Sequence, residues 1–125
     1  MSLVDCSKVC VKDAGFQRGL GAFANEDISA GDIVEVGVVR RVETEGNKNP
    51  YLFTWSEDRT VWAFASGCAT FYNTSKDPNT KMDRDFVNDV YTVWAIKDIQ
   101  KDEELTHTYR SLSWRTCFQE LNKSI

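Results

Sequence analysis

Residues 67–79 constrain the fold of this chain more than any other stretch, because a polar and irregular segment is entered through two aromatic residues. The segment reads Gly-Cys-Ala-Thr-Phe-Tyr-Asn-Thr-Ser-Lys-Asp-Pro-Asn and lies between two strand-like regions. Its Asn, Thr, Ser, Asp and Pro residues are types that bond to their own backbone or fix a turn. An ordinary surface turn is the simpler interpretation. Phe71 and Tyr72 instead suggest a loop that is pressed against the core, where it must satisfy its own polar groups.

Short β-rich segments separated by turn residues fill most of the chain, which predicts an all-β-dominated fold. The segment 80–88 is charged, and we expect it to be exposed. Near the C-terminus, Trp114, Cys117, Phe118 and Leu121 recur at helical spacing, which predicts a short helix there. Strands are expected at residues 8–12 (an edge strand), 33–42, 51–55, 61–64, 90–96 and 104–109.

Two segments of the chain resemble each other. Residues 22–35 and 93–106 each contain a strand ending in Ala, then Asp-Ile, then a turn that leads into a second strand. We interpret them as one strand-turn-strand device used twice, and not as a solenoid repeat. A chain of 125 residues has room for one core, so we expect a single domain over residues 1–125.

The charge and the apolar pattern restrict the class of protein. The net charge of −4 is poorly suited to direct nucleic-acid binding, whereas it suits a basic partner such as a lysine-rich peptide. No apolar run is long enough for a membrane span or a signal-peptide core, so we expect an intracellular protein without membrane contact. The spacing of Cys6, Cys10, Cys68 and Cys117 fits no zinc pattern, and we expect four reduced and mostly buried thiols.

The glycine pair Gly19 and Gly21 flanks Leu20 just before a strand. A dinucleotide-binding loop would need a third glycine where Ala24 stands, and a helix after it, so that interpretation fails. Two interpretations remain open. The pair either lets a ligand approach the backbone closely or forms a tight turn or bulge.

Three motifs occur in order along the chain: Arg-Gly-Leu-Gly-Ala-Phe at residues 18–23, Asn-Thr-Ser-Lys-Asp-Pro-Asn at 73–79 and Glu-Leu-Thr-His-Thr-Tyr at 104–109. Together with Tyr-Leu-Phe at 51–53, this order resembles the SET-domain family of protein lysine methyltransferases. The resemblance covers residues 8–114. The length is similar to that of the minimal stand-alone SET proteins of large algal viruses.

The resemblance implies a β-clip, SET-like fold of several small sheets, in which residues 73–79 and 104–109 thread past each other in a pseudoknot. It also implies binding of S-adenosyl-L-methionine on one side and entry of a substrate lysine from the other. Tyr109 would be the catalytic tyrosine, and Tyr51 would line the lysine channel. The implied cofactor contacts are Gly19, Leu20, Gly21, Asn73, Thr74 and Trp114. No metal is implied.

Two of the positions that depart from the family pattern bear on the site. Thr74 stands where the family usually has histidine, which bears on cofactor affinity. His107 stands where the family carries an aromatic residue of the channel; it is either a site residue close to the lysine or a structural histidine. These departures favour the alternative of a degenerate SET-like module that binds a basic peptide without methylating it. Gly19, Gly21 and Tyr109 match the family pattern, which favours an active enzyme.

The resemblance implies a lysine-containing protein as substrate, with histone tails as the commonest target of the family. The cytoplasm or a host nucleus is the expected location, and so short a version is compatible with a homodimer.

Overall fold

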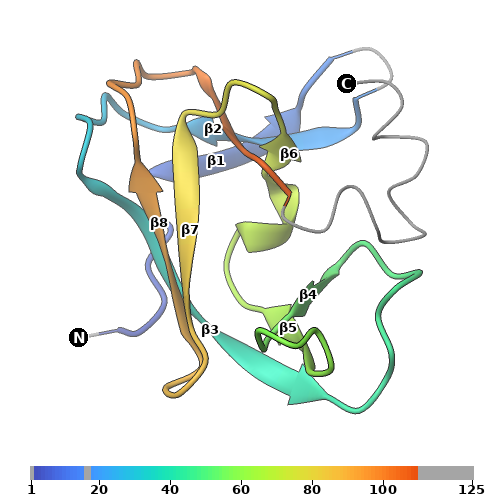
Figure 1. Ribbon diagram of the computed structural model, residues 1–125. Coiled ribbons are helices and arrows are strands. Elements are labelled where there is room, and N and C mark those ends of the chain that lie inside the picture. Colours follow the sequence, from blue (N-terminus) through green and yellow to red (C-terminus); the bar gives the residue numbers. More distant parts are fainter. Residues whose placement is uncertain (1, 16–17, 110–125) are drawn as a thin grey trace.

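The computed structural model describes residues 2–15 and 18–109, and nearly every regular element in these ranges is a β-strand (Figure 1). The strands form one four-stranded and one five-stranded sheet, joined by irregular segments and by the short 3-10 turn η1 (Ala69–Phe71). The prediction of an all-β-dominated fold with several small sheets is therefore confirmed. Within the described ranges, no helix combines the length and the apolar character needed to cross a membrane. The predicted C-terminal helix lies outside the described residues.

The smaller sheet joins segments that are far apart in the sequence. Its strand order is β1 (Val9–Asp13), β2 (Leu20–Ala24), β9 (Glu104–His107) and β6 (Asn73–Thr74). The pairs β1–β2 and β2–β9 are antiparallel, whereas β6 runs parallel to β9. As predicted, β1 lies at the edge. This sheet brings all three sequence motifs into contact.

The larger sheet is organised around one long strand. Its order is β4 (Leu52–Thr54), β5 (Trp62–Ala65), β3 (Ile33–Val42), β8 (Val90–Ala95) and β7 (Thr80–Asp85), with every pair antiparallel. The first part of β3 pairs with β8, and its last four residues pair with β5. The observed β3 coincides with the predicted strand at residues 33–42, since it is long and rich in valine.

The expectation that residues 80–88 form an exposed charged segment is wrong for the part that forms β7. Thr80 and Met82 are buried, while Lys81 and Asp83, which alternate with them, are exposed. Strand side chains alternate between the two faces of a sheet, so two inward residues suffice when the neighbouring strand β8 supplies the pairing. A strand with so few apolar residues has no distinct signal in composition.

The two similar segments pack against each other with reciprocal hydrogen bonds. Ile28 N–H donates to Ile99 O and Ile99 N–H donates to Ile28 O, both at 2.8 Å. Each aspartate also bonds to the turn of the other segment. Asp98 Oδ1 accepts from Ala30 N–H at 2.9 Å, and Asp27 Oδ1 accepts from Lys101 N–H at 2.8 Å. The Asp-Ile motif thus occurs twice because each copy caps the turn of the other.

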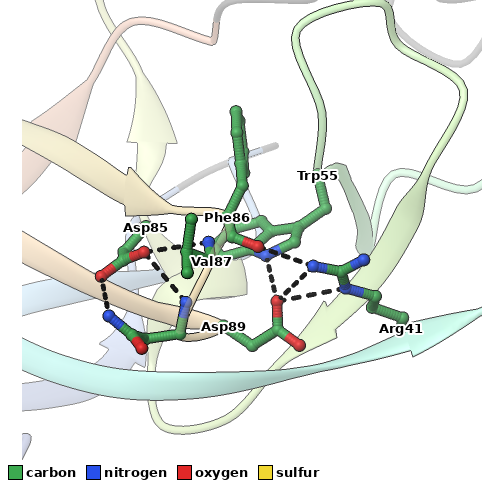
Figure 2. A network of polar contacts seen from close by, with 7 residues as sticks. Arg41, Trp55, Asp85, Phe86, Val87 and Asp89 are labelled. Carbon is green, nitrogen blue, oxygen red and sulfur yellow. Dashed lines mark hydrogen bonds and ion pairs between the residues drawn. The ribbon is translucent and has the colours of Figure 1, made fainter.

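A polar network around the buried Trp55 fastens the β7–β8 hairpin to the rest of the larger sheet (Figure 2). Asp89 Oδ1 accepts from Arg41 Nη2 at 2.9 Å and from Trp55 Nε1 at 3.0 Å. The Trp55 ring is 1% exposed and meets Phe86 edge to face, with 5.4 Å between the ring centroids. The Arg41 guanidinium and the indole N–H hold the pKa of Asp89 below its usual value, with the Arg41 bond the larger cause.

We expect the Asp89→Ala variant to lose about 1–3 kcal/mol of unfolding free energy, since it leaves the indole N–H of buried Trp55 without its acceptor. The lowered pKa implies that this stabilisation is present above the unfolded pKa of Asp and is lost as the pH falls through the lower folded pKa. Urea unfolding of both proteins at neutral and acidic pH measures the difference. Asp83→Ala, an exposed change on the same hairpin, is the control and should remain within about 0.5 kcal/mol of the parent.

The expectation of mostly buried cysteines is wrong for the thiols that the structure describes. Cys10 is exposed, and Cys6 and Cys68 are only half-buried. Cysteine is often buried because it behaves as a small hydrophobe. Here Cys10 lies on the edge strand β1, and Cys6 precedes it in an irregular segment, so neither reaches the core.

Candidate active site

The segment around β6 carries the chain from one edge of strand β9 to the other. On the first edge, β6 pairs with β9, and Ser75 N–H donates to His107 O at 3.0 Å. On the second edge, Asn79 and Thr80 bond to Thr106. The backbone groups of successive strand residues point to opposite edges, so the contacts of His107 and Thr106 lie on opposite sides of β9. The predicted crossing of residues 73–79 and 104–109 is therefore present.

The second edge of β9 is satisfied by side chains in place of a partner strand. Asn79 Nδ2 donates to Glu104 O at 2.8 Å, and Asn79 Oδ1 accepts from Thr106 N–H at 2.9 Å. Thr80 Oγ1 donates to Thr106 O at 2.8 Å. Asn79 is 8% exposed and Thr80 1%, so these bonds are shielded from water. The amide of Asn79 thus replaces a missing peptide group, which explains its place at the end of the motif.

Tyr109 follows β9 and is held at both ends. Its backbone N–H donates to Thr74 Oγ1 at 3.1 Å, and its hydroxyl donates to the backbone carbonyl of Tyr72 at 2.8 Å. Burial, and secondarily the negative charge of Glu104, raises the pKa of Tyr109 to about 12. The residue is therefore a neutral phenol at physiological pH. Its hydroxyl proton points at the Tyr72 carbonyl, which fixes the orientation of the phenol oxygen.

His107 lies between the two tyrosines. Its ring is 6% exposed, and its centroid is 5.2 Å from that of Tyr109 in an edge-to-face contact and 5.7 Å from that of Tyr72. His107 also lines a cavity of about 160 Å³ together with Pro78, Thr80, Lys81, Met82, Arg84, Ile96 and Thr108. The structure thus places this histidine in the aromatic cluster of the site, beside Tyr109.

The buried carboxylate of Glu35 holds the hydroxyl of Tyr72. Tyr72 donates its hydroxyl to Glu35 Oε1 at 2.7 Å, and Tyr91 donates to Glu35 Oε2 at 2.6 Å. Burial, followed by the charge of Glu35, raises the pKa of both phenols, and also raises the pKa of the nearby Cys68 thiol to about 12. Glu35 therefore fixes the tyrosine whose carbonyl orients Tyr109. Sequence reasoning missed this role, since only the fold joins residues so far apart in the chain.

The glycine pair, Asn73 and Glu104 form a second group on the other side of the crossing. Asn73 Nδ2 donates to Glu104 Oε2 at 2.8 Å and to Leu20 O at 3.4 Å. Arg18 pairs with Glu104 Oε1 at 2.8 Å. A Cβ atom at Gly21 would lie 2.9 Å from Glu104 Oε2 and 3.1 Å from Asn73 Nδ2, so the close approach of these side chains requires glycine.

The space beside this group is open. Gly19 has a positive φ of 70°, and a Cβ atom there would meet no heavy atom within 4 Å. Leu20 is 56% exposed although it is apolar. An open backbone turn next to an exposed leucine, an amide and a carboxylate can hold a polar ligand with an apolar part. Glu104 and its partner Arg18 belong to this group, although sequence reasoning treated them only as parts of motifs.

Two predicted site residues are not joined to this arrangement. Tyr51 precedes β4 in the larger sheet and is 63% exposed, and within the described residues its side chain makes no hydrogen bond or ring contact. Its role in the channel remains a prediction. Trp114 lies outside the described residues. The other predicted residues gather at the crossing: Gly19, Leu20, Gly21, Asn73, Thr74, His107 and Tyr109.

Comparison with known proteins identifies the same family as the motifs. The sequence model of the SET domain matches residues 19–110. A relative in Schizosaccharomyces pombe, a histone-lysine N-methyltransferase specific for lysine 37 of histone H3, is 26% identical over 106 residues, which cover 78% of this chain and 71% of the relative.

Solved structures agree with the fold. A Plasmodium falciparum protein named as a candidate histone methyltransferase is 28% identical, with a TM-score of 0.66, and the match covers 86% of this chain and 96% of that one. The Chaetomium thermophilum Polycomb repressive complex 2 in an autoinhibited conformation bound to S-adenosylmethionine gives a TM-score of 0.71 at 23% identity. That match covers 96% of this chain but only 17% of the complex chain, so it bears on the domain fold alone.

Proposed function

The chain belongs to the SET domain family, and we propose that it is an S-adenosylmethionine-dependent protein lysine N-methyltransferase. SET methyltransferases use S-adenosylmethionine as the methyl donor. The observation that carries the proposal is the arrangement of Tyr109, whose hydroxyl is anchored on the Tyr72 carbonyl beside the crossing. The glycine pair and Asn73 lie at the same crossing, in the smaller sheet. A module that only bound a peptide would have no need of this anchored phenol.

The residues near Gly19 fit the proposed cofactor. The sulfonium and ammonium groups of S-adenosylmethionine are cationic, and the Glu104 carboxylate, which also pairs with the half-exposed Arg18, lies beside the open turn at 15% side-chain exposure. The open backbone at Gly19, the exposed Leu20 and the amide of Asn73 would hold the remaining polar and apolar parts. When bound, the cofactor supplies a methyl group that is activated by the positively charged sulfur.

The transfer is an in-line displacement in which the lysine amine forms a bond to the methyl carbon while the carbon–sulfur bond breaks. The enzyme mainly supplies position and electrostatics. Tyr109 donates its own proton to Tyr72, so its oxygen can accept a hydrogen bond from the amine and face the positive charge of the methyl group. His107 and Tyr72 are buried beside Tyr109 and keep water from its ring. The amine must arrive neutral, so its excess proton passes to solvent.

The methyl-transfer rate should rise with pH between about pH 7 and 10, because the unperturbed lysine amine has a pKa of about 10.4 and only its neutral form reacts. With its pKa raised to about 12 by burial, Tyr109 stays neutral over this range and adds no descending limb. The pH profile of kcat/KM with a lysine peptide measures this. A descending limb at about pH 8–9 that vanished in Tyr109→Phe would contradict the assignment of Tyr109 as a neutral phenol.

Gly21→Ala should weaken S-adenosylmethionine binding by about tenfold or more, because the new methyl group displaces Glu104 and Asn73 from their contact. Calorimetric titration with the cofactor measures the change in Kd. Thermal unfolding of the same variant shows whether the fold survives. Unchanged affinity in a folded variant would place the cofactor elsewhere.

The substrate is proposed to be a lysine in a basic protein, of which a histone tail is the first candidate. The acidic net charge of this chain and the substrate of the Schizosaccharomyces pombe relative support that candidate. A single domain over residues 1–125 and an intracellular location are further proposals, and a homodimer is proposed by analogy with short SET proteins.

Calorimetry with S-adenosylmethionine, followed by methyl transfer to a panel of lysine peptides, tests the enzyme. Binding followed by a mass gain of one or more methyl groups is the expected result. Absence of cofactor binding at millimolar concentration would exclude the enzyme. Cofactor-independent binding of a basic peptide would then identify the non-methylating module.

A further inference from the structure

Two thiols and one carboxylate from three distant segments meet beneath the candidate active site. Cys6 lies in the N-terminal segment, Glu35 lies in β3 and Cys68 immediately precedes η1. One ligand atom from each of them lies within 4.8 Å of the other two. Two thiolates on a zinc ion are about 3.8 Å apart in tetrahedral geometry with bonds of about 2.3 Å. The cluster is therefore within about 1 Å of a spacing at which one ion contacts all three ligands.

The carboxylate of this cluster is buried without a positive charge beside it. Glu35 is 1% exposed, and no ion pair within residues 2–15 and 18–109 involves it. Its donors are neutral: the hydroxyls of Tyr72 and Tyr91, and the backbone N–H of Cys68 at 2.7 Å. Burying a carboxylate is costly unless a counter-charge compensates it.

The Glu35 carboxylate can also accept a further bond at one of its oxygens. Oε2 accepts two hydrogen bonds, from Cys68 N–H and from the Tyr91 hydroxyl, whereas among the described residues Oε1 accepts only that of Tyr72. A carboxylate oxygen has two lone pairs, so one on Oε1 remains. The two thiols are half-buried and chemically soft, which favours a thiophilic cation over magnesium or calcium.

We propose that Cys6, Glu35 and Cys68 form a binding site for one divalent thiophilic cation of the zinc class. Binding would replace the thiol protons, which pass to solvent, and would leave a fourth coordination position for water. The motif-like spacing that usually marks zinc sites is missing, because the ligands are brought together by the sheet and not by one loop.

The position of the site connects it with the anchored tyrosine. Glu35 bonds the Tyr72 hydroxyl, and the Tyr72 carbonyl accepts from Tyr109. A cation there would also tie the N-terminal segment to the chain just before η1. Loading is therefore expected to raise the melting temperature of the protein.

To test the proposal, the full chain is reduced, freed of metal with a chelator, and titrated first with Co²⁺ and then with Zn²⁺. We expect one Co²⁺ per chain with a thiolate-to-cobalt charge-transfer band, displaced by one Zn²⁺. Cys6→Ser and Cys68→Ser should each weaken binding by more than about 100-fold, since even groups that only support a ligand are worth about 10- to 100-fold. Cys10→Ser is the matched control, and its affinity should equal that of the parent.

Cys6 lies in an irregular, half-buried segment, so its substitution is expected to leave the fold intact, which circular dichroism verifies. Absence of a charge-transfer band in the parent, or equal loss of affinity in Cys6→Ser and Cys10→Ser, would overturn the proposal. The Glu35→Gln variant tests the contribution of the carboxylate apart from that of the thiols. It should weaken Co²⁺ binding and retain the thiolate-to-cobalt charge-transfer band. Parent-like affinity in a folded Glu35→Gln variant would remove Glu35 from the ligand set.

Discussion

Tyr109→Phe is expected to lower the methyl-transfer turnover by about 100- to 1,000-fold, the usual effect of removing one preorganised polar group from a reacting centre. The substitution removes only the hydroxyl oxygen. The ring can keep its edge-to-face contact with His107, and the backbone N–H can keep its bond to Thr74 Oγ1. The loss should therefore fall on kcat, which single-turnover transfer to a lysine peptide measures.

Cofactor affinity separates a catalytic from a structural role for Tyr109. Gly19, Gly21, Asn73 and Glu104 form the candidate cofactor group, whereas the Tyr109 hydroxyl bonds to the Tyr72 carbonyl, so the Kd for S-adenosylmethionine should stay near that of the parent. If turnover and cofactor affinity fell by the same factor, Tyr109 would be a structural residue, and the alternative of a peptide-binding module would gain support.

Asn79→Ala is expected to destabilise the fold by about 2–4 kcal/mol, because it leaves two buried backbone groups of β9 without partners. Asn79 bonds to both Glu104 O and Thr106 N–H on this edge, and it is 8% exposed. Chemical denaturation measures the loss. Since β9 leads directly to Tyr109, the same variant should also lose methyl-transfer activity at temperatures where the parent is stable.

Thr80→Val provides a graded comparison for the same edge. It keeps the volume of the side chain and removes one hydrogen bond, that from Thr80 Oγ1 to Thr106 O. The expected cost is about 1 kcal/mol, which is roughly half the effect of Asn79→Ala or less. Asn25→Ala removes an exposed amide contact and should stay within about 0.5 kcal/mol of the parent. Equal losses in Asn79→Ala and Asn25→Ala would show that the crossing does not depend on the amide of Asn79.

Features of the fold with a local cause could be predicted from the sequence. The run of valines in β3 marks a strand on its own, and the predicted range 33–42 is the observed one. The repeated Asp-Ile turns were visible as similar segments. The crossing at residues 73–79 was expected only through the family resemblance, since no local property of a polar loop indicates that it passes around another strand.

Features that depend on tertiary contacts were missed. β7 has too few apolar residues to be recognised without its partner β8. Glu35 looks like an ordinary strand residue until the fold surrounds it with Tyr72 and Tyr91, which lie 37 and 56 positions away. Cysteine spacing likewise gave no sign that Cys6 and Cys68 meet. For Glu35 and for the two cysteines, the decisive partner lies outside any window that a local pattern can sample.

The crossing at β9 has a consequence for the order of folding. Both edges of β9 are occupied by segments that precede it in the chain, β6 on one side and Asn79 and Thr80 on the other. Its contacts span long sequence separations, and such contacts form slowly, so we expect β9 to dock late in folding. The hydroxyl of Tyr109, which follows β9, is then expected to reach its place in the same late step. A chain in which this step has not occurred would hold much of its β-structure and carry no methyl-transfer activity.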